Sequence, residues 1–520
     1  MNTVSCIKNT TFYDNWFFSV ISGVLIILSQ PPLSLYPVAY IALIPLISSL
    51  KKNNMRHSFI SGFITGIVSY LGLIYWVVIA MNRYGGIDIY TSSLILLLFV
   101  LYLACYTGVF ALSVSFLETK LFVPLYISAP VLWVLLEYLR GILMTGFPWY
   151  LFAYSQHNFL PAIQIVSITG PYFVSFLIVS MNCILYHIFI IMTGKIKSKR
   201  EPVFLLYVAV VTTLITATLF YGYNRMNFKD KGDLKVAIIQ GNTLQNLKWD
   251  DAYKANIVKT YYQKTLEAGK GANLVIWPET AMPFVFNEDI HVNRFVKELS
   301  CRLKTCLLFG TVSRDKEGKY YNTSYVYDNT GELAGSYSKV HLVPFGEYTP
   351  LIEYLPFLTK FTAAGGDFKR GENHRPVKTS AGSIGILICY EGTFPYITND
   401  TVRKGGQVLV NITNDAWFGK TSAPYQHLTF YVFRAIETDR YVLRAANTGI
   451  SAIIDPRGRI VQNTGIFTED SLKGNFSLHN GETFYVNRGD YFIFAAFLFL
   501  AFVCGIKVFK ISIKNRKAEN

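Results

Sequence analysis

The chain has 520 residues, of which 52% are hydrophobic and 16% are charged, against about 25% charged residues in a typical soluble protein. The net charge is +15, and charged residues are sparse in residues 1–222 (11 Lys and Arg, 5 Asp and Glu) but common in residues 223–488 (32 and 26). This composition excludes a disordered or fibrous chain and also a purely soluble one. The sequence therefore predicts a membrane bundle joined to a globular domain.

Eight apolar segments are candidate membrane spans, because a helix needs roughly 20 apolar residues to cross a bilayer. The first two are short, and Pro31, Pro32 and Pro37 separate them. We predict about seven helices in residues 1–222, and a C-terminal membrane helix with a basic cytoplasmic tail in residues 489–520. The eight segments lie near residues 16–29, 38–50, 58–80, 89–116, 122–139, 163–192, 203–221 and 491–508.

Basic residues predict the orientation of this bundle. Alternate short loops, beginning with the first 15 residues and ending with the tail from Lys507, together hold 14 Lys and Arg, whereas the opposite short loops hold only Arg83 and Arg140. Loops rich in Lys and Arg stay in the cytoplasm. We therefore expect residues 223–488 on the extracytoplasmic side. The first segment ends in a poor signal-peptide cleavage sequence, so we expect it to remain as an anchor.

From Leu234 onward, short apolar runs alternate with polar helical stretches, which is typical of a layered α/β domain with a mixed sheet. Hairpins are expected at residues 320–332 and 450–458, where turn residues follow β-rich runs. The predicted buried strands are residues 235–240, 273–278, 305–311, 383–388 and 407–412, and the predicted helices are residues 250–268, 292–303, 395–404 and 424–438.

Residues 340–370 interrupt this alternation with several prolines and the pair Gly365-Gly366. A long insertion of this kind is usually a functional loop. Its apolar side chains favour a site mouth that dips toward lipid, and its glycines favour a loop that opens; a loop packed permanently on the domain is the alternative. The apolar residues are Leu355, Phe357, Leu358 and Phe361.

A cysteine, a glutamate and a lysine, three residue types that can support nucleophilic catalysis, lie at or near the ends of predicted strands. Cys389 directly follows one buried strand and Glu279 follows another, while Lys339 precedes a second carboxylate, Glu347, by eight residues. A free thiol is mostly protonated at neutral pH, so it needs a nearby base or ammonium group to act as a nucleophile. Taken alone, each residue also has an ordinary structural interpretation. Cys301 and Cys306 are five apart, and a disulfide between them remains open.

A strand-end glutamate, lysine and cysteine in this chain order resemble the carbon–nitrogen hydrolase (nitrilase) superfamily. With the membrane spans, the whole chain resembles its membrane-anchored branch, the apolipoprotein N-acyltransferase family. One departure is Thr243-Leu244, where such sequences often have a proline. The motifs that carry the resemblance are Gln240-Gly241-Asn242, Lys248-Trp249, Trp277-Pro278-Glu279-Thr280, residues 339–348, Cys389-Tyr390-Glu391, residues 414–419 with Gln426-His427, and residues 444–449.

The resemblance implies a nitrilase-like αββα sandwich in residues 223–488 and a role for each matching residue. Glu279 would be the general base, Lys339 the oxyanion stabiliser and Cys389 the nucleophile. Supporting roles are implied for Glu347, Tyr390, Glu391 and Trp249. Oxyanion donors of this kind contribute roughly 3 kcal/mol each. His341 and His427 are interpreted as structural, because Glu279 already supplies a base.

The resemblance further implies a transfer in two steps. Cys389 takes an acyl chain from a membrane phospholipid as a thioester, and the α-amine of a diacylglyceryl-cysteine apolipoprotein then receives it. No cofactor, metal or nucleic acid is expected, and we expect a monomer in the bacterial inner (cytoplasmic) membrane. Two alternatives stay open: a membrane-tethered amide or nitrile hydrolase with the same triad, and a non-catalytic lipid-binding protein.

Overall fold

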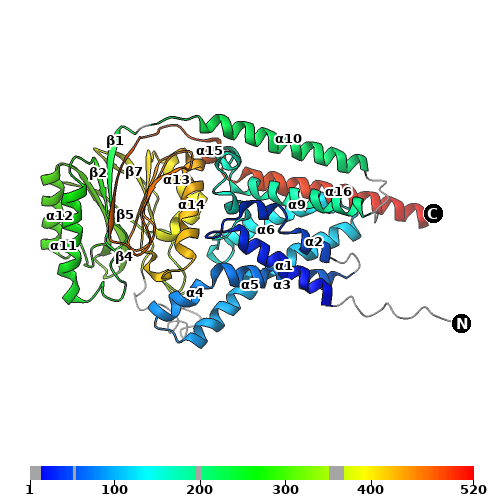
Figure 1. Cartoon of the computed structure of the whole chain (residues 1–520), viewed down its shortest axis with the longest axis horizontal. Helices are drawn as coiled ribbons and strands as arrows, with labels where there is room; N and C mark the ends of the chain where they lie inside the picture. Colours follow the sequence, from blue (N-terminus) through cyan, green and yellow to red (C-terminus); the bar gives the residue numbers. More distant parts are fainter. Residues whose placement is uncertain (1–12, 51–53, 194–200, 231, 351–367, 520) are drawn as a thin grey trace. The chain divides into compact units, whose positions relative to one another are not determined.

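The computed structural model describes residues 13–50, 54–193, 201–230, 232–350 and 368–519 (Figure 1). The chain divides into two compact units. The first contains residues 1–75, 94–224 and 490–520, and the second contains residues 76–93 and 225–489. The short segment 76–93 thus groups with the second unit, although the predicted membrane bundle of residues 1–222 contains it and the predicted spans 58–80 and 89–116 include its two ends.

The first unit is helical. Among the described residues, six helices are long and apolar enough to span a membrane, which confirms the multi-pass bundle. The first two predicted segments form shorter apolar helices, Trp16–Ser29 and Tyr36–Ser49. The principal helices are α1 (Tyr13–Ser29), α2 (Ile44–Ser49), α3 (Met55–Ile74), α5 (Ile89–Lys120), α6 (Leu125–Ile142), α9 (Pro171–Met192), α10 (Glu201–Met226) and α16 (Tyr491–Glu519).

Small residues bring α3 and α5 close together. A Cβ atom added at Gly62 would lie 2.3 Å from the carbonyl oxygen of Thr107, and one added at Gly66 would lie 2.7 Å from the Cα of Ala104. Gly62 and Gly66 are four residues apart on one face of α3, which is the small-residue spacing that lets membrane helices approach each other. The sequence of α3 therefore specifies a tight helix pair within the bundle.

The second unit contains two six-stranded sheets, which confirms the αββα sandwich that the resemblance implies. The strand orders are β12-β1-β2-β3-β4-β5 and β11-β10-β9-β8-β7-β6, and each sheet has parallel and antiparallel pairs. The strands of the first sheet are β1 (Leu234–Gln240), β2 (Leu274–Ile276), β3 (Cys306–Arg314), β4 (Tyr320–Tyr327), β5 (Leu333–Ser338) and β12 (Asp470–Phe476). Those of the second are β6 (Val377–Thr379), β7 (Gly382–Ile388), β8 (Val408–Thr413), β9 (Val442–Ala446), β10 (Ala452–Ile454) and β11 (Ile460–Asn463).

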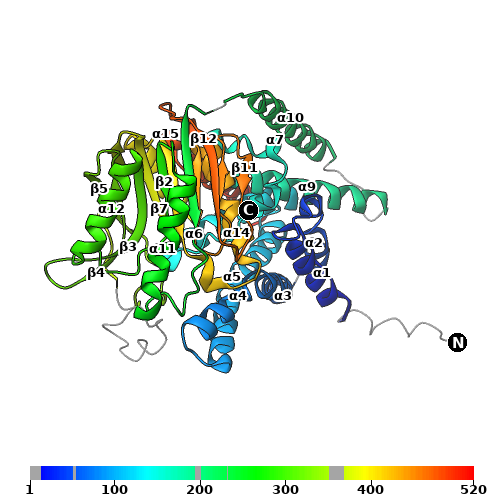
Figure 2. The same cartoon turned by 60° about the vertical axis from the view of Figure 1, so that its left-hand side comes forward.

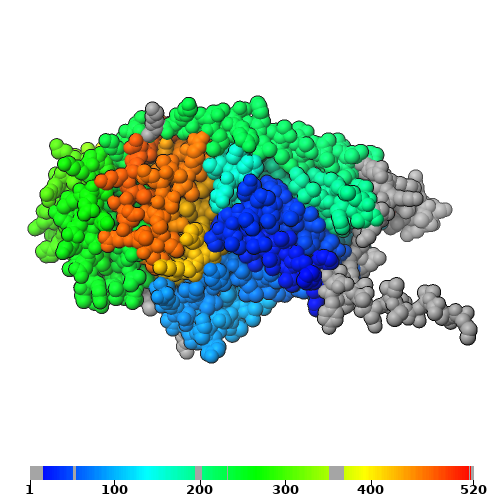
Figure 3. All heavy atoms as spheres, in the orientation of Figure 1, coloured from blue at the N-terminus to red at the C-terminus, as the bar shows by residue number. Residues whose placement is uncertain are grey.

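Helices cover the outer faces of both sheets, which gives the αββα order. Figures 1 and 2 show α11 (Asp251–Ala268) and α12 (Ile290–Leu303) outside the first sheet. Figure 1 shows α13 (Pro395–Arg403) and α14 (Ala423–Thr438) beside the second. In the space-filling view, the orange atoms of the segment that contains β11 and β12 face the viewer (Figure 3), and β11 is exposed along its length.

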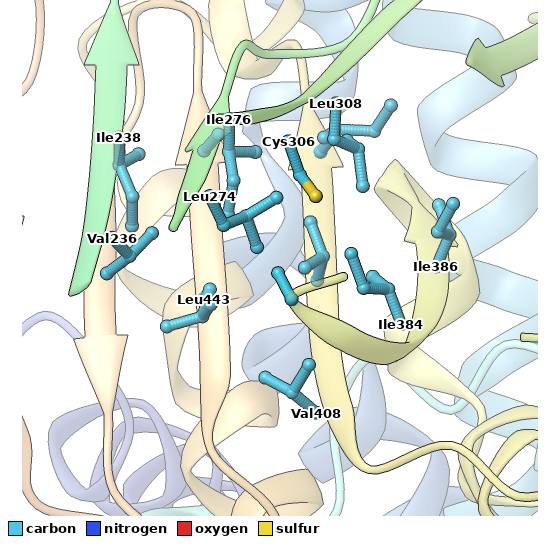
Figure 4. Close-up of a cluster of buried hydrophobic side chains, with 14 of the residues drawn as sticks. Val236, Ile238, Leu274, Ile276, Cys306, Leu308, Ile384, Ile386, Val408 and Leu443 are labelled. Atoms are coloured by element: carbon cyan, nitrogen blue, oxygen red, sulfur yellow. The ribbon is translucent and has the colours of Figure 1, made fainter. Parts of the chain in front are cut away.

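The main core of this unit lies between the two sheets. Side chains from β1 and β2 point toward those from β7, β8 and β9 (Figure 4), and nearly all are inaccessible to solvent. A second apolar cluster lies between the first sheet and helices α11 and α12. Burial of these aliphatic side chains, each worth about 1.5–3 kcal/mol, fixes the strands and hence the positions of the residues that follow them.

Both predicted hairpins are confirmed, since β4 pairs antiparallel with β5 and β10 pairs antiparallel with β11. The predicted strands and helices of this unit agree with the observed ones to within a few residues. Most of the expected functional loop, with its apolar residues and Gly365-Gly366, falls in residues 351–367, outside the described residues. Its opening toward lipid stays a prediction.

Candidate active site

Three strand ends carry the predicted catalytic side chains. Glu279 lies three residues after β2, while Lys339 and Cys389 immediately follow β5 and β7. Because β2 and β5 belong to one sheet and β7 to the other, the site lies where the two sheets end side by side. The structure brings the two charged groups close together: Lys339 Nζ lies 3.9 Å from Glu279 Oε1.

Glu279 is held by hydrogen bonds on both carboxylate oxygens. Oε1 accepts a hydrogen bond from Asn322 Nδ2 at 2.7 Å, and Oε2 accepts one from the backbone N–H of Asn414 at 2.8 Å. The Glu279 side chain is almost fully buried. Burial raises its pKa, with a further contribution from the charge on Glu347, while Lys339 opposes the shift. A carboxylate with a raised pKa is a stronger base than an exposed one.

Lys339 makes a closer ion pair with Glu347. Lys339 Nζ lies 2.8 Å from Glu347 Oε2, and Glu347 Oε1 accepts a hydrogen bond from Asn322 at 2.9 Å. Burial opposes the charge on Lys339, but Glu347, Cys389 and Glu279 together raise its pKa above the ordinary value. The lysine therefore remains an ammonium group at neutral pH, as an oxyanion stabiliser requires.

Cys389 begins a short 3₁₀-helix, η6 (Cys389–Thr393), in a left-handed backbone conformation with φ of 53°. Such a conformation is uncommon outside glycine and turns the chain sharply at the end of β7. The hydroxyl of Tyr431 on α14 donates a hydrogen bond to the Cys389 carbonyl oxygen at 2.9 Å. Burial raises the pKa of the thiol, and the charge on Glu279 raises it further, while Lys339 acts in the opposite direction. The resting thiol is therefore protonated and needs a base to react.

Glu391 ties the lysine segment to the cysteine turn. Its Oε1 accepts hydrogen bonds from the backbone N–H groups of Val340 (2.7 Å) and His341 (3.1 Å), and from the Tyr337 hydroxyl (2.9 Å). Its Oε2 accepts one from the backbone N–H of Ile388 at 2.8 Å. One buried carboxylate thus binds the chain on both sides of the site, which fixes Lys339 relative to Cys389.

The remaining predicted supporting residues differ in their surroundings. Tyr390 is buried and packs edge-on against the ring of Phe394, with ring centroids 5.0 Å apart. Trp249 has a side chain that is 47% exposed, and its neighbour Lys248 is the buried member of the pair. A supporting role for Trp249 stays a prediction.

Two residues that contact the site do not follow from the sequence reasoning. Asn322, in the middle of β4, donates to both Glu279 and Glu347, and no pattern marks it out. Lys248 donates to the Glu279 carbonyl oxygen at 3.1 Å and to Thr280 Oγ1 at 2.8 Å. The Lys248-Trp249 motif points to this part of the chain, but it does not indicate which of the two side chains is buried.

A second buried network supports the cysteine side of the site. Arg444 donates to Asp415 Oδ2 at 2.7 Å, and His427 Nδ1 lies 2.9 Å from Asp415 Oδ1. The Arg444 guanidinium also lies over the ring of Tyr431, 4.8 Å from its centroid. Burial lowers the pKa of His427, and the charge on Arg444 lowers it further. His427 thus lies in a buried network with Asp415 and Arg444, and its structural role stays a prediction.

No metal-binding cluster is present among the residues that the structure describes: no three His, Cys, Asp or Glu side chains lie close enough to hold an ion. Cys301 and Cys306 are both free thiols, so they form no disulfide in this structure. Cys306 Sγ lies 3.1 Å from Ser380 Oγ within the core.

The family model of carbon-nitrogen hydrolases matches residues 235–483, and that of the apolipoprotein N-acyltransferase N-terminal domain matches residues 22–184. The second unit is thus a carbon–nitrogen hydrolase domain, joined to a multi-pass membrane bundle. A crystal structure of a carbon-nitrogen hydrolase from Helicobacter pylori is 16% identical, with a TM-score of 0.38, and the match covers 46% of this chain and 88% of that one.

Two relatives match along nearly the whole chain. An apolipoprotein N-acyltransferase of Geobacter metallireducens is 41% identical over 509 residues, which cover 96% of this chain and 97% of the relative. One of Pasteurella multocida is 30% identical over 508 residues, which cover 94% and 95%. The chain belongs to the apolipoprotein N-acyltransferase family.

Proposed function

We propose that the chain transfers an acyl group from a membrane phospholipid to the α-amine of an N-terminal diacylglyceryl-cysteine on an apolipoprotein. The relatives' shared name supports the acceptor and the transfer. One observation carries the mechanism: Lys339 and Glu279 form a buried pair 3.9 Å apart, and Glu391 ties the segment after Lys339 to the strand that ends just before Cys389. A nucleophile, a base and a cation in this arrangement suit acyl transfer through a covalent intermediate.

In the first step, Glu279 takes the thiol proton as Cys389 Sγ attacks the ester carbonyl of the phospholipid. Lys339 stabilises the negative oxygen of the tetrahedral intermediate. When the intermediate collapses, the C–O bond breaks, and the lysophospholipid oxygen leaves with the proton from Glu279. The acyl chain remains on Cys389 as a thioester.

In the second step, the acceptor amine attacks the thioester carbonyl, and Lys339 again stabilises the negative oxygen. Glu279 takes a proton from the nitrogen, the C–S bond breaks, and the proton passes to the departing sulfur. The product is an amide, and Cys389 returns to its resting thiol. No net proton or electron is gained or lost over the cycle.

The supporting residues position these groups. Glu347 keeps the Lys339 ammonium charged and in place at 2.8 Å. Glu391 holds the backbone on both sides of the site, and buried Tyr390 packs beside it. Trp249, whose ring is partly exposed, is assigned a contact with substrate. A tethered site suits two lipid-anchored substrates, because the shared bilayer keeps both near the enzyme.

The proposal includes a location. The bias of Lys and Arg toward alternate loops supports a bacterial inner membrane protein, active as a monomer, whose residues 223–488 lie on the periplasmic side. The alternative function is a membrane-tethered amide or nitrile hydrolase, which the match of residues 235–483 to carbon-nitrogen hydrolases favours. In that case water would replace the amine in the second step.

The test uses purified protein, phospholipid and a synthetic diacylglyceryl-cysteine peptide. Mass spectrometry should find one added acyl group on the peptide. With phospholipid alone, intact protein should gain one acyl mass at Cys389 that neutral hydroxylamine releases. Cys389→Ala and Cys389→Ser should abolish both products, and Glu279→Gln should abolish loading.

The matched control is Cys301→Ala, which removes an exposed free thiol and should leave both products unchanged. Peptide acylation by the Cys389→Ala protein would refute the assigned nucleophile. Release of free fatty acid or amide cleavage without any acylated peptide would favour the hydrolase.

A further inference from the structure

Lys248 is a buried cation that the proposed reaction does not use. It lies in the turn between β1 and α11, with 1% of its surface exposed. Its Nζ donates to the backbone carbonyl of Glu279 and to the hydroxyl of Thr280, which are both neutral acceptors. A buried ammonium group without a close counter-charge is costly, because its hydration is lost without full compensation. We therefore expect Lys248 to have a function that offsets the free energy lost on burying its ammonium group.

The turn that Lys248 contacts is strained. Thr280 has a φ of 45°, a left-handed conformation that is rare for a β-branched residue and costs on the order of 1–3 kcal/mol. The backbone of Gly310 also lies close to this turn, since a Cβ added there would lie 2.6 Å from the Cα of Glu279. Lys248 and Gly310 therefore both contact the turn and limit its movement. From this turn the Glu279 carboxylate reaches Asn322 and the backbone of Asn414.

Lys248 also acts on Glu279 electrostatically. The charged and titratable groups that act on Glu279 are Lys339 and Glu347 near its carboxylate, the Cys389 thiol across the site, and Lys248 on its backbone side. The charge on Lys248 lowers the pKa of Glu279. Burial in turn lowers the pKa of Lys248 to about 7, although the charge on Glu279 opposes this shift. The ammonium group of Lys248 is therefore partly deprotonated at neutral pH.

We propose that Lys248 is a positioning residue for Glu279: it holds the strained turn that aims the carboxylate, and it places a buried cation on the backbone side of that turn. The proposal rests on the assigned role of Glu279 as general base. Lys248 itself touches neither the thiol nor the acyl carbonyl. Its effect reaches the reaction through the geometry and the ionisation of Glu279.

The test compares Lys248→Met, which keeps the length and removes the charge, with Lys248→Arg, which keeps a permanent charge. Lys270→Met is the matched control at an exposed lysine. Acyl loading of Cys389 from phospholipid and alkylation of Cys389 by iodoacetamide are both measured against pH, and folding is checked by thermal unfolding.

We expect Lys248→Met to load Cys389 about tenfold more slowly at neutral pH and to shift the acidic limb of both profiles to higher pH, because Glu279 then binds its proton more tightly. The pH profiles of Lys248→Arg should keep the acidic limb of the wild type. They should lose any inflection near neutral pH, because arginine stays charged there. Lys270→Met should match the wild type throughout.

The proposal would be overturned if folded Lys248→Met protein showed pH profiles of acyl loading and alkylation with the same shape as those of the wild type. A lower rate alone would not support it. If the wild type itself does not load an acyl group, the proposed function fails, and the alkylation profiles still decide the role of Lys248.

Discussion

At the level of single residues, the site combines buried charges that partly cancel one another. Lys339 is compensated by Glu347 at 2.8 Å and by Glu279 at 3.9 Å, so the ammonium group stays charged without contact with water. Removing one partner of such a buried pair typically costs 3–5 kcal/mol, because the other charge is left uncompensated. The neutral Cys389 thiol completes the resting state. On the proposed mechanism, the thiol proton passes to Glu279 when a carbonyl group is bound.

The buried Asp415 predicts an acid sensitivity. Burial opposes its charge, but Arg444 and His427 lower its pKa from 3.8 to about 2. A carboxylate with a lowered pKa in the folded state stabilises the fold above its ordinary pKa, and this contribution is lost as the pH falls from about 4 to about 2. The shift corresponds to roughly 2 kcal/mol. The unfolding free energy of the wild type in detergent should fall by about this amount over that range, relative to Asp415→Asn.

The matched control for this experiment is Asp251→Asn, which changes a carboxylate whose side chain is 92% exposed. It should follow the wild-type curve. Parallel pH curves for the wild type and Asp415→Asn would contradict the prediction. The network around Asp415 would then owe its stability to neutral hydrogen bonds.

The sequence marked out Glu279 and Cys389 because each follows a strand with a recognisable apolar run. It marked out Lys339 through the family resemblance, and the roles of all three stay predictions. It missed Asn322, because a polar residue in the middle of a strand is common and its partners come from a different strand and a distant loop. The motif of Lys248 and Trp249 was recognised, but it did not indicate that Lys248 is the buried member and Trp249 the partly exposed one. Side-chain direction in an irregular turn has no period from which to infer it.

At the level of elements, the cysteine turn depends on close packing between η6 and α14. A Cβ added at Gly392 would lie 2.2 Å from the ring of Tyr431, which is fully buried and holds the Cys389 carbonyl. Gly392→Ala should therefore displace Tyr431 and the turn, and we expect acyl loading of Cys389 to fall at least about tenfold, as small misplacements of a nucleophile do. Loading is measured by intact-protein mass spectrometry.

Gly481→Ala is the control, because a Cβ at that position meets no atom within 4 Å. This variant should load at the wild-type rate. Normal loading by Gly392→Ala would mean that the turn tolerates a shift of Tyr431, and the hydrogen bond to Cys389 would then be dispensable.

The strands of the second unit could be predicted where they are central and apolar, as β1, β3 and β8 are. The strands β6, β9 and β12 were not predicted, and β5 and β11 were expected only as second strands of the two hairpins. β6 and β12 lie at sheet edges and contain polar or glycine residues that weaken the apolar pattern. β9 is central and buried, but Arg444 interrupts its short apolar run. The division into two sheets came from the family resemblance and not from the residue pattern, because local patterns do not say which strands share a sheet.

At the level of the whole molecule, the sequence predicts a membrane topology, and the six long apolar helices supply spans whose orientation can be tested. With the N-terminus in the cytoplasm, each further span reverses the side, and the Lys-rich and Arg-rich loops all fall on the cytoplasmic side. A reporter that is active only outside the cytoplasm should therefore work when fused after Lys229. It should fail when fused after Lys120 or at the C-terminus. The physical reason is that a basic loop resists transfer across the membrane.

The C-terminal fusion is the most informative of the three, because the side on which it lies depends on the total number of spans, including α16. A cytoplasmic reporter at the same three positions is the control and should give the opposite pattern. Activity of the extracytoplasmic reporter at the C-terminus would mean an odd number of spans. One of the two short N-terminal helices, Trp16–Ser29 or Tyr36–Ser49, would then not cross the membrane. An inactive fusion after Lys229 would place the Glu279–Lys339–Cys389 site in the cytoplasm, on the wrong side for an acceptor that has already been exported.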